Sequence, residues 1–308
     1  MKKIDKMLVI GDLIIDILIE GKVIRISPEA PIPILDVEKK TLSLGGVGNI
    51  IDYFFYKKEK INFILFIGKK NYFKEIFLLL KKYKSFINKI FIGNVNNIIK
   101  YRYASNNQYI LRADEHENYS VNLKYHNHVI KFLKNSTINY VCISDYNKGN
   151  IDNLFLERIS EICRLKRIKI ILDTKKRNFE HLKDIFLITP NLSEIKDLCK
   201  LDQKTPLKKT INQVIKFKKK NNIENILITM SEDGAVLINR KQNIKKFPTT
   251  KKIIYDVTGA GDVLFSSIIY NLLKKNTLEK SIQIAVREAT RSVEIFGKIS
   301  ENKFEIQI

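Results

Sequence analysis

The chain has 308 residues, of which 55 are Lys or Arg and 33 are Asp or Glu, so its formal net charge is +22. A hydrophobic share of 44% supports a sizeable core, which excludes a disordered chain, and no apolar run approaches the roughly 18 residues of a membrane span. The three cysteines are odd in number and widely separated, which favours reduced thiols in a cytoplasmic protein over a disulfide framework.

The positive charge has two interpretations. The basic residues are mostly lysine, and Lys, Ile and Asn all have A/U-rich codons, so an AT-biased genome would place many lysines on solvated faces. The alternative is a surface that binds nucleic acid or anionic substrates. We favour the first interpretation, because recognition of phosphate groups would select Arg more strongly than Lys.

Short apolar runs that end in a polar residue alternate with helical patterns along the chain. The expected strands are Met7–Gly11, Ile61–Gly68, Tyr140–Ser144, Ile168–Asp173, Phe186–Thr189 and Ile226–Met230. The expected helices are Val47–Tyr56, Ile151–Leu165, Lys208–Lys220, Ala260–Leu273 and Leu278–Phe296. This alternation predicts an α/β fold with a mostly parallel central sheet and helices on both faces. Ligands of such sheets bind beyond the carboxyl ends of the strands, where Asp12, Asp145, Asp173 and Asn191 lie.

Two stretches break the alternation. Leu18–Glu38 places three prolines among residues typical of strands, and Ile98–Ala113 alternates in places and is rich in Tyr and Ile. Both patterns predict antiparallel strands outside the main sheet. We therefore expect a single domain, 1–308, with a small β-strand lid at about 17–40 and 97–114.

The strongest motif is Asp256–Asp262, in which two glycines precede an apolar helical pattern. Backbone N–H groups of such a turn, together with the helix N-terminus, can approach an anion. An Asp in this turn is unexpected, because its charge would repel that anion. A role as a base explains it: the Asp would accept the proton of a hydroxyl that attacks a phosphoryl group. The alternative is an ordinary glycine turn with Asp262 as a helix cap.

Three motifs together resemble one family. Asp256–Asp262 is similar to the C-terminal signature of the ribokinase (PfkB) family of sugar kinases, and Gly45–Asn49 and Asn191–Glu194 stand where that family has its Gly-Gly and Asn-x-x-Glu motifs. Arg25–Pro33 and Ser144–Gly149 narrow the resemblance to D-glycero-D-manno-heptose 7-phosphate kinases. The match covers essentially the whole chain and implies a ribokinase-like fold.

The resemblance implies an ATP-dependent kinase. It would phosphorylate the C1 hydroxyl of D-glycero-D-manno-heptose 7-phosphate to the 1,7-bisphosphate, for the lipopolysaccharide inner core. Many relatives continue into a nucleotidyltransferase domain. We expect no such domain here, which would assign that second activity to a separate polypeptide. The resemblance also implies a homodimer formed through the lid strands.

The resemblance also assigns the centre of the reaction. Asp262 is the expected base for the sugar hydroxyl, and Gly259, Ala260 and Gly261 are expected to donate N–H groups to the transferred phosphoryl group. Glu194 would hold Mg²⁺ through water, with Asn191 beside it, and its alternative role is in a helix capping box. Ser231, Gly234 and Thr258 are the remaining candidates for contacts to the nucleotide.

Sugar and phosphate contacts are assigned to other segments. Asp12, Asp16, Gly45, Gly46 and Asn49 are the candidates for binding sugar hydroxyls, and Asp16 has the alternative of a residue at the lid hinge. The candidates for phosphate groups are basic, and their alternative role is in structural ion pairs, for example with Asp114; they are Arg102, Arg112 and Lys175.

One segment departs from the family pattern. Where relatives have Ala-Asn and further alanines beside the nucleotide, this chain has Val286 and charged residues up to Arg291. Because this segment lies beside the nucleotide in relatives, this chain could bind its nucleotide with a different affinity. Two alternatives to a heptose kinase therefore remain, namely another sugar kinase of the same family and a degenerate, non-catalytic or nucleic-acid-binding relative.

Overall fold

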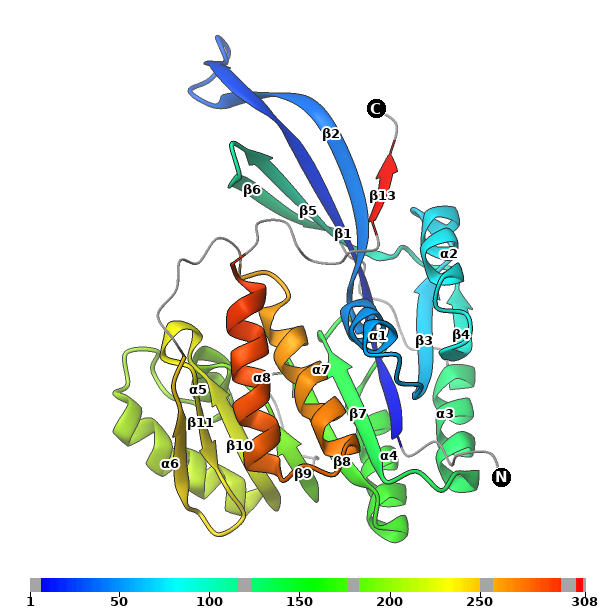
Figure 1. The fold of residues 1–308 in the computed structure, drawn as a ribbon, viewed down its shortest axis with the longest axis vertical. Coiled ribbons are helices and arrows are strands. Elements are labelled where there is room, and N and C mark those ends of the chain that lie inside the picture. The colour runs from blue at the N-terminus through cyan, green and yellow to red at the C-terminus, as the bar shows by residue number, and fades with distance from the viewer. Residues whose placement is uncertain (1–6, 116–122, 177–182, 250–256, 295–302, 307–308) are drawn as a thin grey trace.

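A long, mostly parallel sheet forms the body of the protein, which was described from a computed structural model over residues 7–115, 123–176, 183–249, 257–294 and 303–306 (Figure 1). Its strand order is β4-β3-β1-β7-β8-β9-β10-β11-β12, in which the pairs β10–β11 and β11–β12 are antiparallel and all other pairs are parallel. The strands are β1 (Met7–Ile26), β3 (Asn62–Gly68), β4 (Ile87–Gly93), β7 (Tyr140–Asp145), β8 (Lys169–Thr174), β9 (Ile185–Ile188), β10 (Ile223–Thr229), β11 (Ala235–Ile238) and β12 (Ile244–Phe247).

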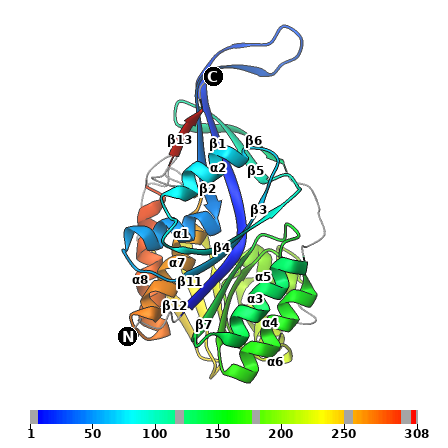
Figure 2. The ribbon, with the colours of Figure 1, turned by 90° about the vertical axis from the view of Figure 1, so that its right-hand side faces the viewer.

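Helices cover both faces of this sheet (Figure 2). One face packs against α1 (Val47–Tyr56), α2 (Phe73–Lys81), α7 (Ala260–Leu273) and α8 (Leu278–Ser292). The other packs against α3 (Leu123–Asn135), α4 (Asn153–Lys166), α5 (Leu192–Leu198) and α6 (Leu207–Lys220). No helix within the described ranges is long and apolar enough to cross a membrane.

Strand β1 shows why the central strands are continuously apolar. Successive side chains of a strand point to opposite faces, so Met7 and Val9 lie in the core on the α1 side while Leu8 and Ile10 lie in the core on the α3 side. Both faces are covered by helices, and both sets of side chains must therefore be apolar. The sheet consequently separates two cores.

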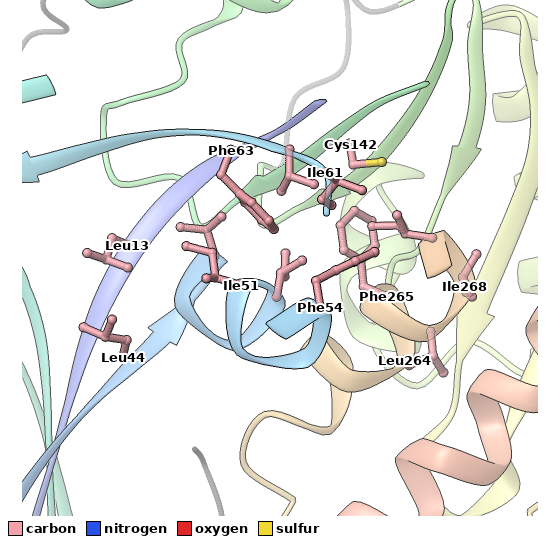
Figure 3. Close-up of a cluster of buried hydrophobic side chains, with 14 of the residues drawn as sticks. Leu13, Leu44, Ile51, Phe54, Ile61, Phe63, Cys142, Leu264, Phe265 and Ile268 are labelled. Atoms are coloured by element: carbon pink, nitrogen blue, oxygen red, sulfur yellow. The ribbon is translucent and has the colours of Figure 1, made fainter. Parts of the chain in front are cut away.

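A cluster of buried apolar side chains packs α1 against α7 (Figure 3). Phe54 of α1 is fully buried and makes edge-to-face contacts with Phe63 of β3 and Tyr270 of α7, with ring centroids 6.3 and 6.2 Å apart. Phe265 of α7 lies in the same cluster. This packing holds α1 against α7.

The lid grows out of the body sheet through β1 itself. Up to Asp12, β1 pairs with body strands, and from Leu13 onward it pairs antiparallel with β2 (Pro33–Gly46) and parallel with β5 (Ile98–Ser105). β6 (Gln108–Glu115) lies beside β5, and β13 (Lys303–Ile306) lies beside β2. We use "lid" for this second sheet, whose order is β13-β2-β1-β5-β6.

The α/β fold with its mostly parallel sheet and lid is confirmed, whereas several boundaries were predicted wrongly. The strand expected at Met7–Gly11 continues to Ile26, because the chain stays extended after Asp12 and pairs there with β2 and β5, and Gly21 only introduces a bulge. The helix expected to reach Phe296 ends at Ser292. The antiparallel strands expected in Leu18–Glu38 and Ile98–Ala113 are present as the β1–β2 and β5–β6 pairs, and a parallel pairing of β1 with β5 joins the two pairs. Elements that the pattern missed are α2, α3, α5, β4, β11, β12 and β13.

Replacing Phe54 tests how much the α1–α7 core contributes to stability. Phe54→Ala should lower the free energy of unfolding by about 3–5 kcal/mol, because it removes a fully buried ring and leaves a cavity. Phe77→Ala is the matched control, since this ring of α2 is 40% exposed, and it should cost less than about 1 kcal/mol. Urea unfolding followed by circular dichroism measures both, and equal losses would contradict the packing described.

Candidate active site

Asp262 lies in the first turn of α7, within the glycine motif. Gly259 precedes the helix with a φ of 75°, a left-handed conformation that favours glycine, and Val263 N donates to its carbonyl at 2.9 Å. Ala260 and Gly261 form the first helical positions, whose N–H groups have no partner within a helix, and the Ala260 N–H donates to the Val257 carbonyl at 3.3 Å. Thr258 belongs to the same turn, while Asp256 lies outside the described residues.

The carboxylate of Asp262 is buried and has one neutral donor on each oxygen. Asn49 Nδ2 donates to Oδ2 and the hydroxyl of Tyr146 donates to Oδ1, both at 2.7 Å. Burial raises the pKa of Asp262 above its ordinary value, the two hydrogen bonds lower it, and the charge of Asp16 raises it again. A carboxylate with a raised pKa in a fixed orientation suits a general base.

Asn49 also presents an acceptor to this site. Its Oδ1 is buried and has no hydrogen-bond partner within the described residues. A buried amide oxygen without a donor is costly, so a hydroxyl placed beside it would be bound favourably. Asn49 and Asp262 thus offer adjacent acceptors for a polyol.

Gly45 and Gly46 allow α1 to start close to β1. A Cβ atom on Gly45 would lie 2.0 Å from Asp16 Oδ2, and one on Gly46 would lie 2.5 Å from the Asp12 carbonyl oxygen. Gly46 also has a φ of 59°. Any larger residue would push away the helix that carries Asn49.

Asp16 is bound to the lid. Its Oδ1 accepts a hydrogen bond from Arg102 Nη1 of β5, and both side chains are buried. Two of the predicted ligand-binding residues are therefore partners of each other. For Arg102, a structural ion pair was the alternative role that the sequence allowed. Asp16 lies on the segment of β1 that joins the body to the lid, which was its own alternative role.

The carboxylate of Asp12 is also buried and hydrogen-bonded. It has no exposed surface, and its carboxylate accepts hydrogen bonds from the Tyr146 N–H and from Asn150 Nδ2, each at 2.7 Å. Burial raises the pKa of Asp12 to about 7, and the nearby Asp145 contributes. In this structure the side chain anchors the loop after β7, and it does not face an open site.

A second group of charged residues lies at the ends of β8 and β9. Lys175 Nζ is 2.6 Å from Glu194 Oε1. Asn191 and Glu194 form a capping box at the start of α5, as their alternative role predicted. Burial raises the pKa of Asp173 to about 6, which Lys175 counteracts. The described residues contain no cluster of three or more metal-binding side chains, so a metal here would depend on Glu194, water and substrate oxygens.

Arg112 is not brought to this centre. It lies on β6 of the lid, is exposed, and forms a two-pronged pair with Asp114, with Nε 3.0 Å from Oδ1 and Nη2 3.2 Å from Oδ2. None of its described contacts reaches Asp262. The ion pair with Asp114 was the alternative that the sequence left open.

A cavity of about 870 Å³ lies between the end of β12 and α8. Its wall includes Val286, Arg287 and Arg291, the segment that departs from the family pattern, and Lys245 and Lys280 add further positive charge. Ser231 and Gly234 do not line this cavity. Their turn adjoins it, since Glu232 lies between them and its carbonyl accepts a hydrogen bond from Thr249 on the cavity wall. A space of this size fits a nucleotide.

Sequence reasoning overlooked Tyr146 and Lys100. Tyr146 follows the end of β7 directly, and Lys100 on β5 places its ammonium 4.7 Å from the centre of the Tyr146 ring. The rule that ligands bind beyond the carboxyl ends of parallel strands would have identified Tyr146. The position of Lys100 depends on the register between β1 and β5, which no local pattern indicates.

The sequence matches a known protein family over residues 5–303, that of the pfkB family carbohydrate kinases. It is 33% identical over 288 residues to the bifunctional protein HldE of Aliarcobacter butzleri and 31% identical over 307 residues to HldE of Sulfurimonas denitrificans. These alignments cover 92% and 98% of this chain but 60% and 63% of the relatives. The chain thus spans about three fifths of the length of these relatives.

Solved structures agree on the fold. The phosphofructokinase-2 of Escherichia coli, in complex with substrates and products, superposes with a TM-score of 0.78 at 14% identity and covers 97% of this chain and 96% of its own. Arabidopsis thaliana ribokinase, complexed with ribose and ATP, gives a TM-score of 0.73 at 15% identity, with 96% and 95% covered. The chain therefore has the ribokinase-like fold and belongs to the pfkB family of carbohydrate kinases, which transfer a phosphoryl group to a sugar hydroxyl.

Proposed function

We propose that this protein transfers the γ-phosphoryl group of ATP to the C1 hydroxyl of D-glycero-D-manno-heptose 7-phosphate, giving the 1,7-bisphosphate for lipopolysaccharide core synthesis in the cytoplasm. The observation that carries the proposal is the buried carboxylate of Asp262, held by two donors at the start of a glycine-flanked helix. The similarity to HldE proteins supports the heptose as the acceptor.

The chemistry assigned to Asp262 is proton removal. The C1 oxygen attacks the γ-phosphorus, the bond from that phosphorus to the leaving oxygen of ADP breaks, and the hydroxyl proton passes to the Asp262 carboxylate. Asn49 Oδ1, which lacks a donor within the described residues, would orient a neighbouring sugar hydroxyl. The N–H groups of Gly259, Ala260 and Gly261 would stabilise the charge that develops on the phosphoryl oxygens.

The nucleotide side of the proposal uses different residues. The ATP bound by Arabidopsis ribokinase supports ATP as the phosphoryl donor, and the cavity beside α8 is large enough for it. Mg²⁺, when bound, would neutralise the phosphate oxygens. Its protein ligand would be Glu194 acting through water, with Lys175 as a second positive charge beside the same carboxylate.

We also propose a homodimer formed through the lid. Large apolar side chains are exposed on lid strands, including Ile24 of β1 at 74% and Leu111 of β6 at 57%. Exposed apolar surface of this kind is typical of an interface between subunits. The proposed function also implies a nucleotidyltransferase activity elsewhere in the pathway, and the word bifunctional in the names of the relatives is compatible with such a partner activity.

The proposed acceptor is tested with purified protein in an assay that couples ADP release to NADH oxidation. Heptose 7-phosphate should give a kcat/KM at least about 10²-fold above those of ribose and fructose 6-phosphate, because a site built to bind polar groups rejects ligands that leave them unpaired. A preference for one of the other two sugars would favour another kinase of the family. DNA binding with a steep salt dependence, without any turnover, would favour the nucleic-acid-binding alternative.

Asp262→Asn tests the proposed base. The variant should lower kcat by about 10²–10⁴-fold, because an amide of the same size cannot accept the proton. In the wild type, kcat should fall with decreasing pH, with a midpoint above the ordinary Asp range, since burial raises the pKa of Asp262 and only the charged form acts as a base. The control is Asp202→Asn, an exposed aspartate of the α5–α6 loop, and unchanged turnover in Asp262→Asn would refute the assignment.

Glu194→Gln tests the magnesium role apart from the capping role. Gln still supports a capping box, so α5 should keep its start while the negative charge is lost. We expect the Mg²⁺ concentration for half-maximal activity to rise about 10-fold, with little change in melting temperature. Glu161→Gln on the exposed face of α4 is the control, and an unaltered Mg²⁺ dependence in Glu194→Gln would exclude Glu194 as the metal ligand.

A further inference from the structure

We infer that Tyr146 is a positioning residue for the base: its hydroxyl sets the orientation of the Asp262 carboxylate, and its ring transmits the position of the lid to that carboxylate. The inference rests on the proposed role of Asp262. It adds a residue that neither the motifs nor the comparisons assign.

The hydroxyl of Tyr146 is one of two fixed donors to the base. It lies 2.7 Å from Asp262 Oδ1, while Asn49 Nδ2 lies 2.7 Å from Oδ2. The donors come from different elements, the loop after β7 and the start of α1, so the carboxylate cannot rotate without breaking one of these bonds. Each carboxylate oxygen keeps a further acceptor site, which is available to a sugar hydroxyl.

Tyr146 is itself held by the body of the protein. Its N–H donates to Asp12 Oδ2 at 2.7 Å. The preceding residue, Asp145, is buried and accepts hydrogen bonds from Asn147 N and Thr174 Oγ1, each at 2.8 Å. The end of β7 is thereby fixed to β1 and β8. This chain of contacts explains why a fully buried carboxylate, Asp12, stands at the point where β1 leaves the body sheet.

The ring of Tyr146 lies near two cations that come from different segments of the chain. Lys100 Nζ of the lid strand β5 is 4.7 Å from the ring centroid, and Lys175 Nζ, next to Glu194, is 5.9 Å from it. Both distances allow cation–π attraction. A movement of the lid would move Lys100 on this ring and so change the hydrogen bond that orients Asp262.

Tyr146→Phe separates this positioning role from packing, because it keeps the ring beside the two lysines and removes only the hydroxyl. We expect kcat to fall by about 10²-fold with a change in KM of less than about 3-fold, since a misplaced base slows the chemical step more than it weakens binding. The acid limb of the kcat profile should move to higher pH, because the lost hydrogen bond had lowered the pKa of Asp262.

Tyr140→Phe is the matched control. Tyr140 lies at the opposite end of the same strand, β7, and its hydroxyl has no hydrogen bond within the described part of the chain. It should keep the wild-type kcat, KM and pH profile. Difluorotyrosine at position 146 provides a second variant, because its more acidic hydroxyl is a stronger donor and should move the acid limb to lower pH.

A readout without substrate keeps this test independent of the proposed function. In protein labelled with ¹³C at the Asp carboxyl carbons, the Asp262 signal is the one that disappears in Asp262→Asn. Its titration midpoint should be higher in Tyr146→Phe than in the wild type or Tyr140→Phe. If no sugar is phosphorylated, the proposed function fails while this titration still tests Tyr146. An unchanged midpoint, or a kinetic loss confined to KM, would overturn the inference.

Discussion

The hydrogen bonds on the two oxygens of Asp262 are the interactions on which the rest of the site depends. Asn49 and Tyr146 reach this carboxylate from 213 and 116 residues away in the chain. Both bonds need the starts of α1 and α7 and the end of β7 to meet at one point. The buried aromatic contacts of Phe54 contribute to this, because they hold α1 against α7. The orientation of the proposed base therefore depends on the packing of the core.

Strand β1 gives the fold its second constraint. Asp12 and Asp16 are an even number of residues apart in a strand, so they lie on the same face, opposite the apolar side chains that pack under α1. Asp12 binds the loop that carries Tyr146, and Asp16 binds Arg102 of the lid. One continuous strand thus ties the loop beside the proposed base to the lid. Two buried acidic residues interrupt its apolar run because each has specific partners there.

The charge of +22 has little to do with this centre. The basic residues beside the site mostly have acidic partners, as Arg102 has Asp16 and Lys175 has Glu194, so their charges are locally compensated. The cavity beside α8 is different: Lys245 pairs there with Glu279, but Lys280, Arg287 and Arg291 also lie on its wall. Positive charge there suits an anionic ligand such as a nucleotide. Elsewhere the lysine excess fits the compositional bias better than a binding surface.

The sequence alone determined the α/β class, the bounds of α1 and α7, and the motif that contains Asp262, because these depend on local periodicity and on glycine at defined positions. It did not reveal that β1 is a single strand shared by two sheets, since an apolar run does not state which neighbours pair with it. It also could not decide between the alternative roles of Arg102, Arg112 and Glu194. The fold shows which group lies within reach of each: Asp16 for Arg102, Asp114 for Arg112, and the Asn191 N–H together with Lys175 for Glu194. The position of Tyr146 beside Asp262 likewise depends on contacts between distant segments, and only the tertiary structure determines such contacts.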